Sequence, residues 1–206
     1  MTVHNHIHPH QQDIEDTPFT EKMLLAQAVE ELIIKKGLTS PEKLREQIEF
    51  LDSREPAIGA RLVAQSWLDP VFKQELLDSV NQAAHKIGID TGEVPIQAVE
   101  NTDKIHNVIV CTLCSCYPRM LIGLPPDWYK SREYRSRTVR EPREVLKEFG
   151  TRISDEIEIC VHDSTADLRY IVLPLRPKGT RSWNIDRLAK LVTRDSMIGV
   201  SQASIQ

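Results

Sequence analysis

The chain has 206 residues, 40% of them hydrophobic and 27% charged, which is ordinary for a folded protein with one sizeable core. Its net charge of −4 at pH 7 argues against general nucleic-acid binding. No run of about 18 apolar residues predicts a membrane span. The polar N-terminus lacks the apolar segment of a secretory signal, so we expect a cytoplasmic protein.

Residues 1–17 form a polar tail with four alternating histidines, His4, His6, His8 and His10. We expect this tail to be disordered because it has no packing pattern. Metal scavenging by the histidines is the less favoured alternative.

Helical periodicity dominates residues 18–93. It predicts a helix over 19–36 that ends at Gly37, and a second over 41–50 that begins at the Ser40-Pro41 cap. The pattern continues from residue 62 to 84 and ends at Gly88. The first two helices have narrow apolar faces and no obvious partner in so short a chain. We therefore predict a helical arm that lies on another subunit, followed by a further helical segment.

Residues 94–206 change to a mixed pattern. Strands are predicted at 107–110, which leads directly into Cys111, and at 156–162 and 170–173. Pro142 and Gly150 bracket a helix, and Asn184 caps a short one. An apolar stretch follows at 197–200. The predicted fold class is α+β, with an N-terminal helical arm followed by a compact layered α/β domain that carries the cysteines.

One segment, 130–143, runs against the overall acidic balance. It holds six basic residues and two acidic ones: Lys130, Arg132, Arg135, Arg137, Arg140 and Arg143 against Glu133 and Glu141. Such a stripe can bind phosphates, but a solvated face or an ion-paired subunit contact is the favoured interpretation.

Three of the four cysteines, Cys111, Cys114 and Cys116, are too close together for a disulfide framework and indicate metal binding or redox chemistry. A structural zinc site needs four ligands, which His106 or His162 could complete. A zinc-stabilised binding module is therefore one interpretation. It would be a non-enzyme.

The spacing C-x-x-C-x-C also permits a different metal site. Between Cys114 and Cys116 lie backbone amides that, once deprotonated, could bind a metal in one plane with the two sulfurs, while Cys111 supplies an axial sulfur. Such a ligand set suits low-spin trivalent cobalt or iron and not zinc. A sixth position stays open for water or substrate, and thiolates in such a site are prone to oxidation.

The run 110–118, Val-Cys-Thr-Leu-Cys-Ser-Cys-Tyr-Pro, closely resembles the metal loop of nitrile hydratase α subunits. The similarity extends to 59–64, 67, 69–70, 99–102, 123–130, 134–137, 139–143, 163–164, 168–170, 172–174 and 192–200. It covers nearly the whole chain after about residue 20.

The resemblance implies that Cys111, Cys114 and Cys116 are sulfur ligands and that the backbone amides of Ser115 and Cys116 are nitrogen ligands. Cys114 would become a sulfinic acid and Cys116 a sulfenic acid, which makes Cys114, Ser115 and Cys116 the candidate catalytic residues. Thr112 is typical of cobalt members, whereas iron members have serine, so Co(III) is favoured over iron. No organic cofactor is implied.

Members of this family work as heteromers. The resemblance implies a β-type subunit whose arginines hydrogen-bond the oxidised sulfurs, and a dedicated metal-delivery protein. Arg169 corresponds to a position beside the metal ligands, with Asp163 as its expected partner. A purely structural ion pair is the alternative role for these two. The implied reaction is hydration of a small nitrile to the amide, with attack by the Cys116 sulfenate oxygen or by water that it activates.

The sequence departs from the family pattern after the loop, where Arg119 and Met120 replace a tryptophan and a proline. The tryptophan helps to wall the substrate pocket, so Arg119 implies a more polar or anion-tolerant site. The γ subunit of thiocyanate hydrolase is similar in having arginine there. Hydrolysis of thiocyanate to carbonyl sulfide and ammonia is therefore the alternative activity. Arg119 could also simply pair with a carboxylate at a subunit contact.

Overall fold

The computed structural model describes residues 20–205 of the chain. The expected His-rich tail, 1–17, lies outside them. The chain divides into two compact units, residues 1–47 and 48–206. Among the described residues, no helix is both long enough and apolar enough to cross a membrane.

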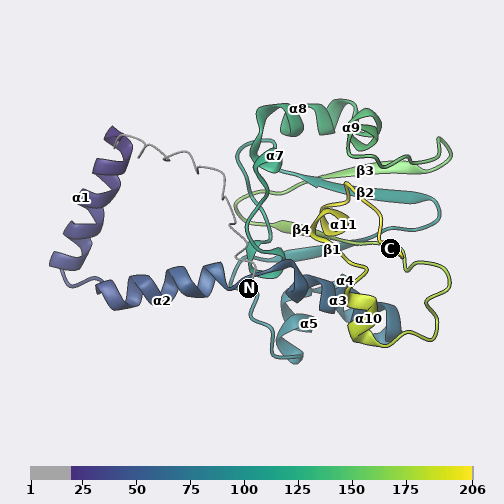
Figure 1. The fold of residues 1–206 in the computed structure, drawn as a ribbon, viewed down its shortest axis with the longest axis horizontal. Helices are drawn as coiled ribbons and strands as arrows, with labels where there is room; N and C mark the ends of the chain where they lie inside the picture. Colours follow the sequence, from purple (N-terminus) through teal and green to yellow (C-terminus); the bar gives the residue numbers. More distant parts are fainter. Residues whose placement is uncertain (1–19, 206) are drawn as a thin grey trace, which may run out of the picture. The chain divides into compact units, whose positions relative to one another are not determined.

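The first unit contains helix α1 (Glu21–Lys35) and most of helix α2 (Pro41–Asp52) (Figure 1). The Thr20 hydroxyl accepts a hydrogen bond from the Met23 amide at the start of α1, and Gly37 follows its end with a φ of 69°. Both predicted helices are confirmed. Neither contains a buried residue, and Leu25 is 65% exposed. The contact of this arm with another subunit stays a prediction.

The second unit begins with helices α3 (Pro56–Leu68), α4 (Pro70–Asp78) and α5 (Val80–Lys86). Asp69 and Ser79 separate them, and each caps the helix that follows with its side chain. Leu62 of α3 and Leu76 of α4 belong to the same hydrophobic core as the strands of the second half. The domain boundary expected near residue 94 is therefore wrong, because these helices supply one wall of that core.

Within the described residues, four strands form two parallel pairs. β1 (Ile96–Glu100) pairs with β4 (Arg169–Leu173), and β2 (Ile105–Val110) pairs with β3 (Glu158–Asp163). Figure 1 shows them between a layer of α3, α4, α5 and α10 (Ile185–Ala189) and a layer containing α8 (Arg132–Arg140) and α9 (Pro142–Glu148). The predicted α+β class is confirmed, although β1 was missed. Because Val110 is in register with Asp163, the ends of β2 and β3 meet at one edge.

The remaining helices are short. They are α6 (Arg119–Ile122), α7 (Asp127–Lys130) and α11 (Arg194–Ile198). The basic stripe falls largely on α8, which the sequence did not predict as a helix. Arg137 forms ion pairs with Glu133, Glu141 and Glu148. These ion pairs lie within the chain, so a subunit contact for the stripe stays a prediction.

A buried histidine joins α11 to β2. His106 is 4% exposed, and its Nε2 lies 2.7 Å from the carbonyl oxygen of Gly199. Its Nδ1 lies 3.3 Å from the Asn101 amide nitrogen. In this arrangement Nε2 donates to Gly199 and Nδ1 accepts from Asn101, which requires a neutral ring. Burial accordingly lowers the pKa of His106, although the Gly199 carbonyl partly opposes the shift.

We expect this histidine to make the fold less stable in acid. A lowered pKa means that the folded state binds the proton less readily than the unfolded state, so stability is lost as the pH falls below about 6.5. Burial lowers the pKa of His162 as well, so it contributes in the same direction. Urea unfolding at about pH 7.5 and about pH 5.5 measures the effect. His106→Gln should reduce the difference between the two pH values, and an unchanged difference would contradict the assignment.

Candidate metal centre

The cysteine loop begins where β2 ends. Val110 is the last residue of the strand, and Cys111 follows it fully buried, with 0% of its surface exposed. The chain then leaves the core, because Cys114 is exposed, and returns to it at Tyr117. The buried strand thus fixes one cysteine, and the other two come back toward it across an exposed turn.

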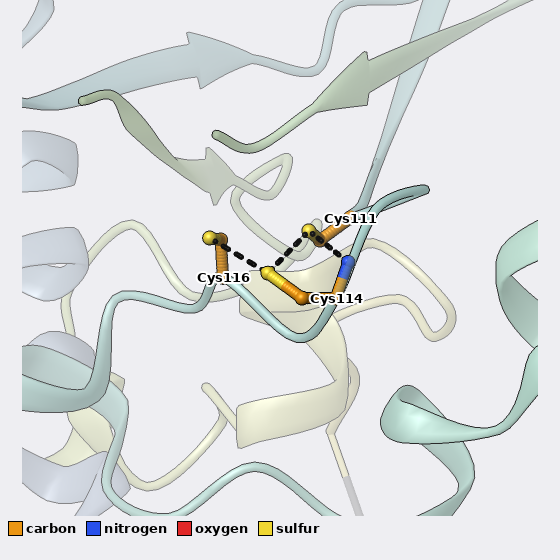
Figure 2. A group of neighbouring side chains, drawn as sticks. All are labelled: Cys111, Cys114 and Cys116. Carbon is orange, nitrogen blue, oxygen red and sulfur yellow. Dashed lines mark hydrogen bonds between the residues drawn. The ribbon is translucent and has the colours of Figure 1, made fainter. Parts of the chain in front are cut away.

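The three sulfur atoms of the loop lie together (Figure 2). The Cys114 sulfur is 3.5 Å from that of Cys111 and 3.3 Å from that of Cys116. The backbone N–H of Cys114 also donates to the Cys111 sulfur at 3.2 Å. All three sulfurs lie within 4.8 Å of one another, so a single ion could bind them together.

The surroundings shift the pKa values of the Cys114 and Cys116 thiols in opposite directions. A hydrogen bond from Cys116, together with the backbone amide of Ser115 and the thiol of Cys111, lowers the pKa of Cys114 to about 7. Burial raises the pKa of Cys116 to about 12, and the positive charge of Arg169 opposes that rise. Cys114 is therefore deprotonated more readily than Cys116, and the thiolate is the form that binds metals.

Zinc ligation by a histidine finds no support in this geometry. Among residues 20–205, the group of potential ligands that contains the three cysteines includes no histidine. Nε2 of His106 is hydrogen-bonded to the Gly199 carbonyl, and Nε2 of His162 lies 2.8 Å from the side-chain oxygen of Asn107. The fourth ligand that a structural zinc site requires is therefore missing from the described part of the chain.

Asp163 holds the loop from the end of β3. Its carboxylate accepts hydrogen bonds from the Thr112 amide at 2.9 Å and from the Thr112 hydroxyl at 2.6 Å. The expected partner, Arg169, forms no ion pair with it among the described residues, so that pairing is wrong. The reason is geometric, because Asp163 ends β3 beside Cys111 whereas Arg169 begins β4 in register with Ile96.

We expect Asp163→Asn to loosen the loop. The two Thr112 bonds use different oxygens of Asp163, and asparagine keeps only one of them and loses the charge. A hydrogen bond to a charged group stabilises by roughly 1.5–3 kcal/mol. Leu113 is 84% exposed, so a protease that cleaves after leucine can report local opening. Cleavage at Leu113 should accelerate about tenfold or more. Thr112→Val removes one of the two bonds and should have a smaller effect. Equal cleavage of parent and Asp163→Asn would contradict the role of Asp163.

Three side chains from α7 and α8 bind backbone carbonyls in and before the loop, and the sequence assigned a role to none of them. The Tyr129 hydroxyl donates to the Cys116 carbonyl at 2.9 Å, and the buried Tyr134 hydroxyl donates to the Ile109 carbonyl at 2.8 Å. Arg135 donates from Nη1 to the Cys114 carbonyl at 2.6 Å. The matching segments 123–130 and 134–137 contained these residues, but a sequence match does not reveal contacts to main-chain atoms.

Arg119 and Arg169 line one cavity of about 130 Å³ together with Tyr117 at the end of the loop. Nη1 of Arg169 and Nε of Arg119 are buried without a hydrogen-bond partner. Arg119 forms a long ion pair of 3.8 Å with Asp52, whose side chain is 62% exposed. A carboxylate does pair with Arg119, as the structural alternative supposed, but the contact lies within the chain. Glu93 also lines the cavity, which leaves two cationic groups against one acidic group there.

Comparison with known proteins gives a consistent result. The sequence profile of the family described as nitrile hydratase, alpha chain, matches residues 20–201. The α subunit of the high-molecular-weight cobalt-containing nitrile hydratase of Rhodococcus rhodochrous is 47% identical over 189 residues, which span 90% of this chain and 93% of the relative. The γ subunit of thiocyanate hydrolase from Thiobacillus thioparus is 42% identical over 190 residues, which span 86% and 78%.

Solved structures agree with the sequence matches. A recombinant thiocyanate hydrolase with partially modified cobalt centres has a TM-score of 0.84 at 39% identity, over 90% of this chain and 91% of that one. A double mutant of the Fe-type nitrile hydratase of Comamonas testosteroni Ni1 has a TM-score of 0.79 at 42% identity, over 89% and 92%. The profile, the relatives and the shared fold lead to one conclusion: the chain belongs to the nitrile hydratase α-chain family, with Cys111, Cys114 and Cys116 as its metal-binding cluster.

Proposed function

We propose that this chain is the metal-bearing α subunit of a cobalt-type nitrile hydratase, which hydrates an organic nitrile to the amide. The observation that carries the proposal is the donor set of the loop. Three sulfurs lie within 4.8 Å of one another, and the backbone amides of Ser115 and Cys116 fall between the second and third cysteines in the sequence. Sulfur and amide nitrogen together suit a trivalent low-spin ion.

Cys111, Cys114 and Cys116 would supply sulfur ligands to that ion, and Ser115 and Cys116 would supply backbone nitrogens. When bound, the ion acts as a Lewis acid that polarises the nitrile group. Cobalt is favoured over iron because Thr112 is typical of cobalt members and a relative at 47% identity is named as cobalt-containing. The exposed Cys114 and the partly exposed Cys116 are accessible to oxidation, which supports their conversion to sulfinic and sulfenic acid.

A partner subunit forms part of the proposal. Relatives are named as subunits, and the cysteine loop of this chain is exposed from Thr112 to Ser115. An exposed loop does not by itself exclude water or enclose a nitrile, so a second chain must complete the pocket. We expect a β-type subunit to cover this face, to contribute arginines to the oxidised sulfurs, and to contact the exposed helices of the N-terminal arm. A metal-delivery protein would load the loop.

Thiocyanate hydrolysis is the second candidate, and the cavity beside the loop is the observation that favours it. Arg119 and Arg169 both line this cavity, and each has a buried nitrogen without a partner. Two guanidinium groups would attract an anion such as thiocyanate more than a neutral nitrile. The long contact with the exposed Asp52 neutralises Arg119 only weakly.

The test is to purify the chain with the subunit encoded beside it and to measure metal, modification and product. We expect one cobalt per α chain, a loop peptide heavier by two oxygens on Cys114 and one on Cys116, and amide from an organic nitrile. Carbonyl sulfide and ammonia from thiocyanate, without amide formation, would favour the second candidate. Stoichiometric zinc, with no cobalt or iron, would contradict both.

A further inference from the structure

Arg135 differs from the other arginines of the basic stripe. Arg137 is held by three glutamates, and Arg143 donates to the carbonyls of Ile153, Ser154 and Ile157. Among residues 20–205, Arg135 forms no ion pair, its Nε is buried without a partner, and the one hydrogen bond of its side chain goes to the Cys114 carbonyl. Ion pairing on the surface does not explain Arg135, because this arginine has no carboxylate partner and instead contacts the backbone of the cysteine loop.

Helix α8 holds this guanidinium in place. Ser131 caps the start of the helix, and Tyr134, the residue before Arg135, is buried and hydrogen-bonded to the Ile109 carbonyl of β2. The Tyr134 ring packs against Trp128 and Phe149 with centroid distances of 4.9 and 6.1 Å. Arg135 therefore extends from helix α8, which is anchored to β2, the strand that leads into Cys111.

The carbonyl that Arg135 binds belongs to the Cys114–Ser115 peptide bond, whose nitrogen is a proposed metal ligand. The oxygen of Cys114 and the nitrogen of Ser115 are the two ends of one conjugated unit, so charge at one end is shared with the other. When the Ser115 nitrogen serves as a metal ligand, negative charge accumulates on the Cys114 oxygen. Nη1 of Arg135 lies 2.6 Å from this oxygen and stabilises the charge on it through a charge-assisted hydrogen bond.

We propose that Arg135 is a positioning residue of the metal centre, which stabilises the Cys114–Ser115 peptide as a nitrogen ligand by compensating the charge on its carbonyl oxygen. The inference rests on the proposed function, because it requires a metal that binds the Ser115 nitrogen. It adds a cation from this chain itself to the arginines expected from the partner subunit.

Tyr129 provides the matched control. Its hydroxyl also donates to a loop carbonyl, that of Cys116, but the nitrogen of that peptide belongs to Tyr117 and is not a proposed ligand. Tyr129→Phe therefore removes a loop tether without changing the charge on a ligand peptide. Arg132→Gln is a second control, since Arg132 is an exposed cation on the same helix with no hydrogen bond among the described residues.

The experiment compares the co-purified complexes of parent, Arg135→Gln, Arg135→Lys, Tyr129→Phe and Arg132→Gln. Two readouts are used, the rate at which a chelator removes cobalt and the position of the sulfur-to-metal charge-transfer absorption. We expect Arg135→Gln to release cobalt about ten- to a hundredfold faster and to shift the absorption. Arg135→Lys should recover most of both properties. Arg132→Gln should stay within about threefold of the parent, and neither control should shift the absorption.

Two results would overturn the inference. One is an Arg135→Gln complex with parental release rate and absorption. The other is a Tyr129→Phe complex that reproduces the changes of Arg135→Gln, which would make Arg135 only a tether. Circular dichroism and thermal melting of each complex verify that the variants are folded. A loaded and active parent with an unaffected Arg135→Gln contradicts this inference alone, whereas a parent without cobalt or iron contradicts the proposed function as well.

Discussion

Replacing Cys114 by serine is expected to abolish metal binding and to lower the activity of the complex by about a thousandfold or more. Cys114 lies in the middle of the cluster, 3.5 Å from the sulfur of Cys111 and 3.3 Å from that of Cys116. A serine hydroxyl is a hard, protonated donor that cannot replace a thiolate for a soft site. The metal contributes several kcal/mol to catalysis, and each 1.36 kcal/mol is about a factor of ten in rate. Elemental analysis and an amide assay measure the two losses.

Folding should survive this substitution, because the side chain of Cys114 is exposed and contributes little to the core. We expect the free energy of unfolding of the metal-free chain to change by about 0.5 kcal/mol or less. Cys160→Ser is the matched control, since Cys160 is a free cysteine on β3 outside the cluster. A Cys114→Ser complex with the parental cobalt content, or a Cys160→Ser complex that loses cobalt equally, would remove the basis for the assigned metal loop.

The sequence was sufficient for the parts of the fold that depend on local signals. Helix α1 has apolar residues at helical spacing and a glycine after its end, and strand β2 ends in three β-branched residues, 108–110, so both could be predicted. Strand β1 was missed because its five residues, Ile-Gln-Ala-Val-Glu, include polar and weakly strand-forming types. Its strand conformation depends on pairing with β4, which lies far away in the sequence.

The candidate site, like the fold, could be predicted only where it depends on residues close together in the sequence. The spacing of Cys111, Cys114 and Cys116 predicted that their sulfurs would meet, because a short loop cannot separate them widely. Contacts that cross the fold could not be predicted. Asp163 was expected to meet Arg169, six residues away in the sequence, but it binds Thr112, which β-strand register brings to the same edge of the sheet. Arg135 was counted as surface charge because nothing in a sequence indicates which backbone carbonyl a side chain will reach.

The largest effect on stability is expected at Gly199, which follows α11. This glycine has a φ of 94°, in the left-handed region that disfavours other residues. A Cβ atom there would overlap the carbonyl oxygen of Asn107 and lie 2.9 Å from the Cα of Val108, both in the backbone of β2. Backbone atoms cannot move aside as a flexible side chain can. We expect Gly199→Ala to lower the free energy of unfolding by about 4 kcal/mol or more, or to prevent folding.

Gly150→Ala separates the two causes of this effect. Gly150 has a similar φ of 80°, but a Cβ there would meet nothing within 4 Å, so only the backbone conformation is penalised. That variant should lose about 1–2 kcal/mol by urea unfolding. If Gly199→Ala loses no more free energy of unfolding than this, close packing of α11 on β2 is not essential.

The contact between Gly199 and β2 also connects to the metal centre. The strand that Gly199 touches at Asn107 and Val108 continues directly into Cys111, and any displacement needed to admit a methyl group would be transmitted to the first sulfur of the cluster.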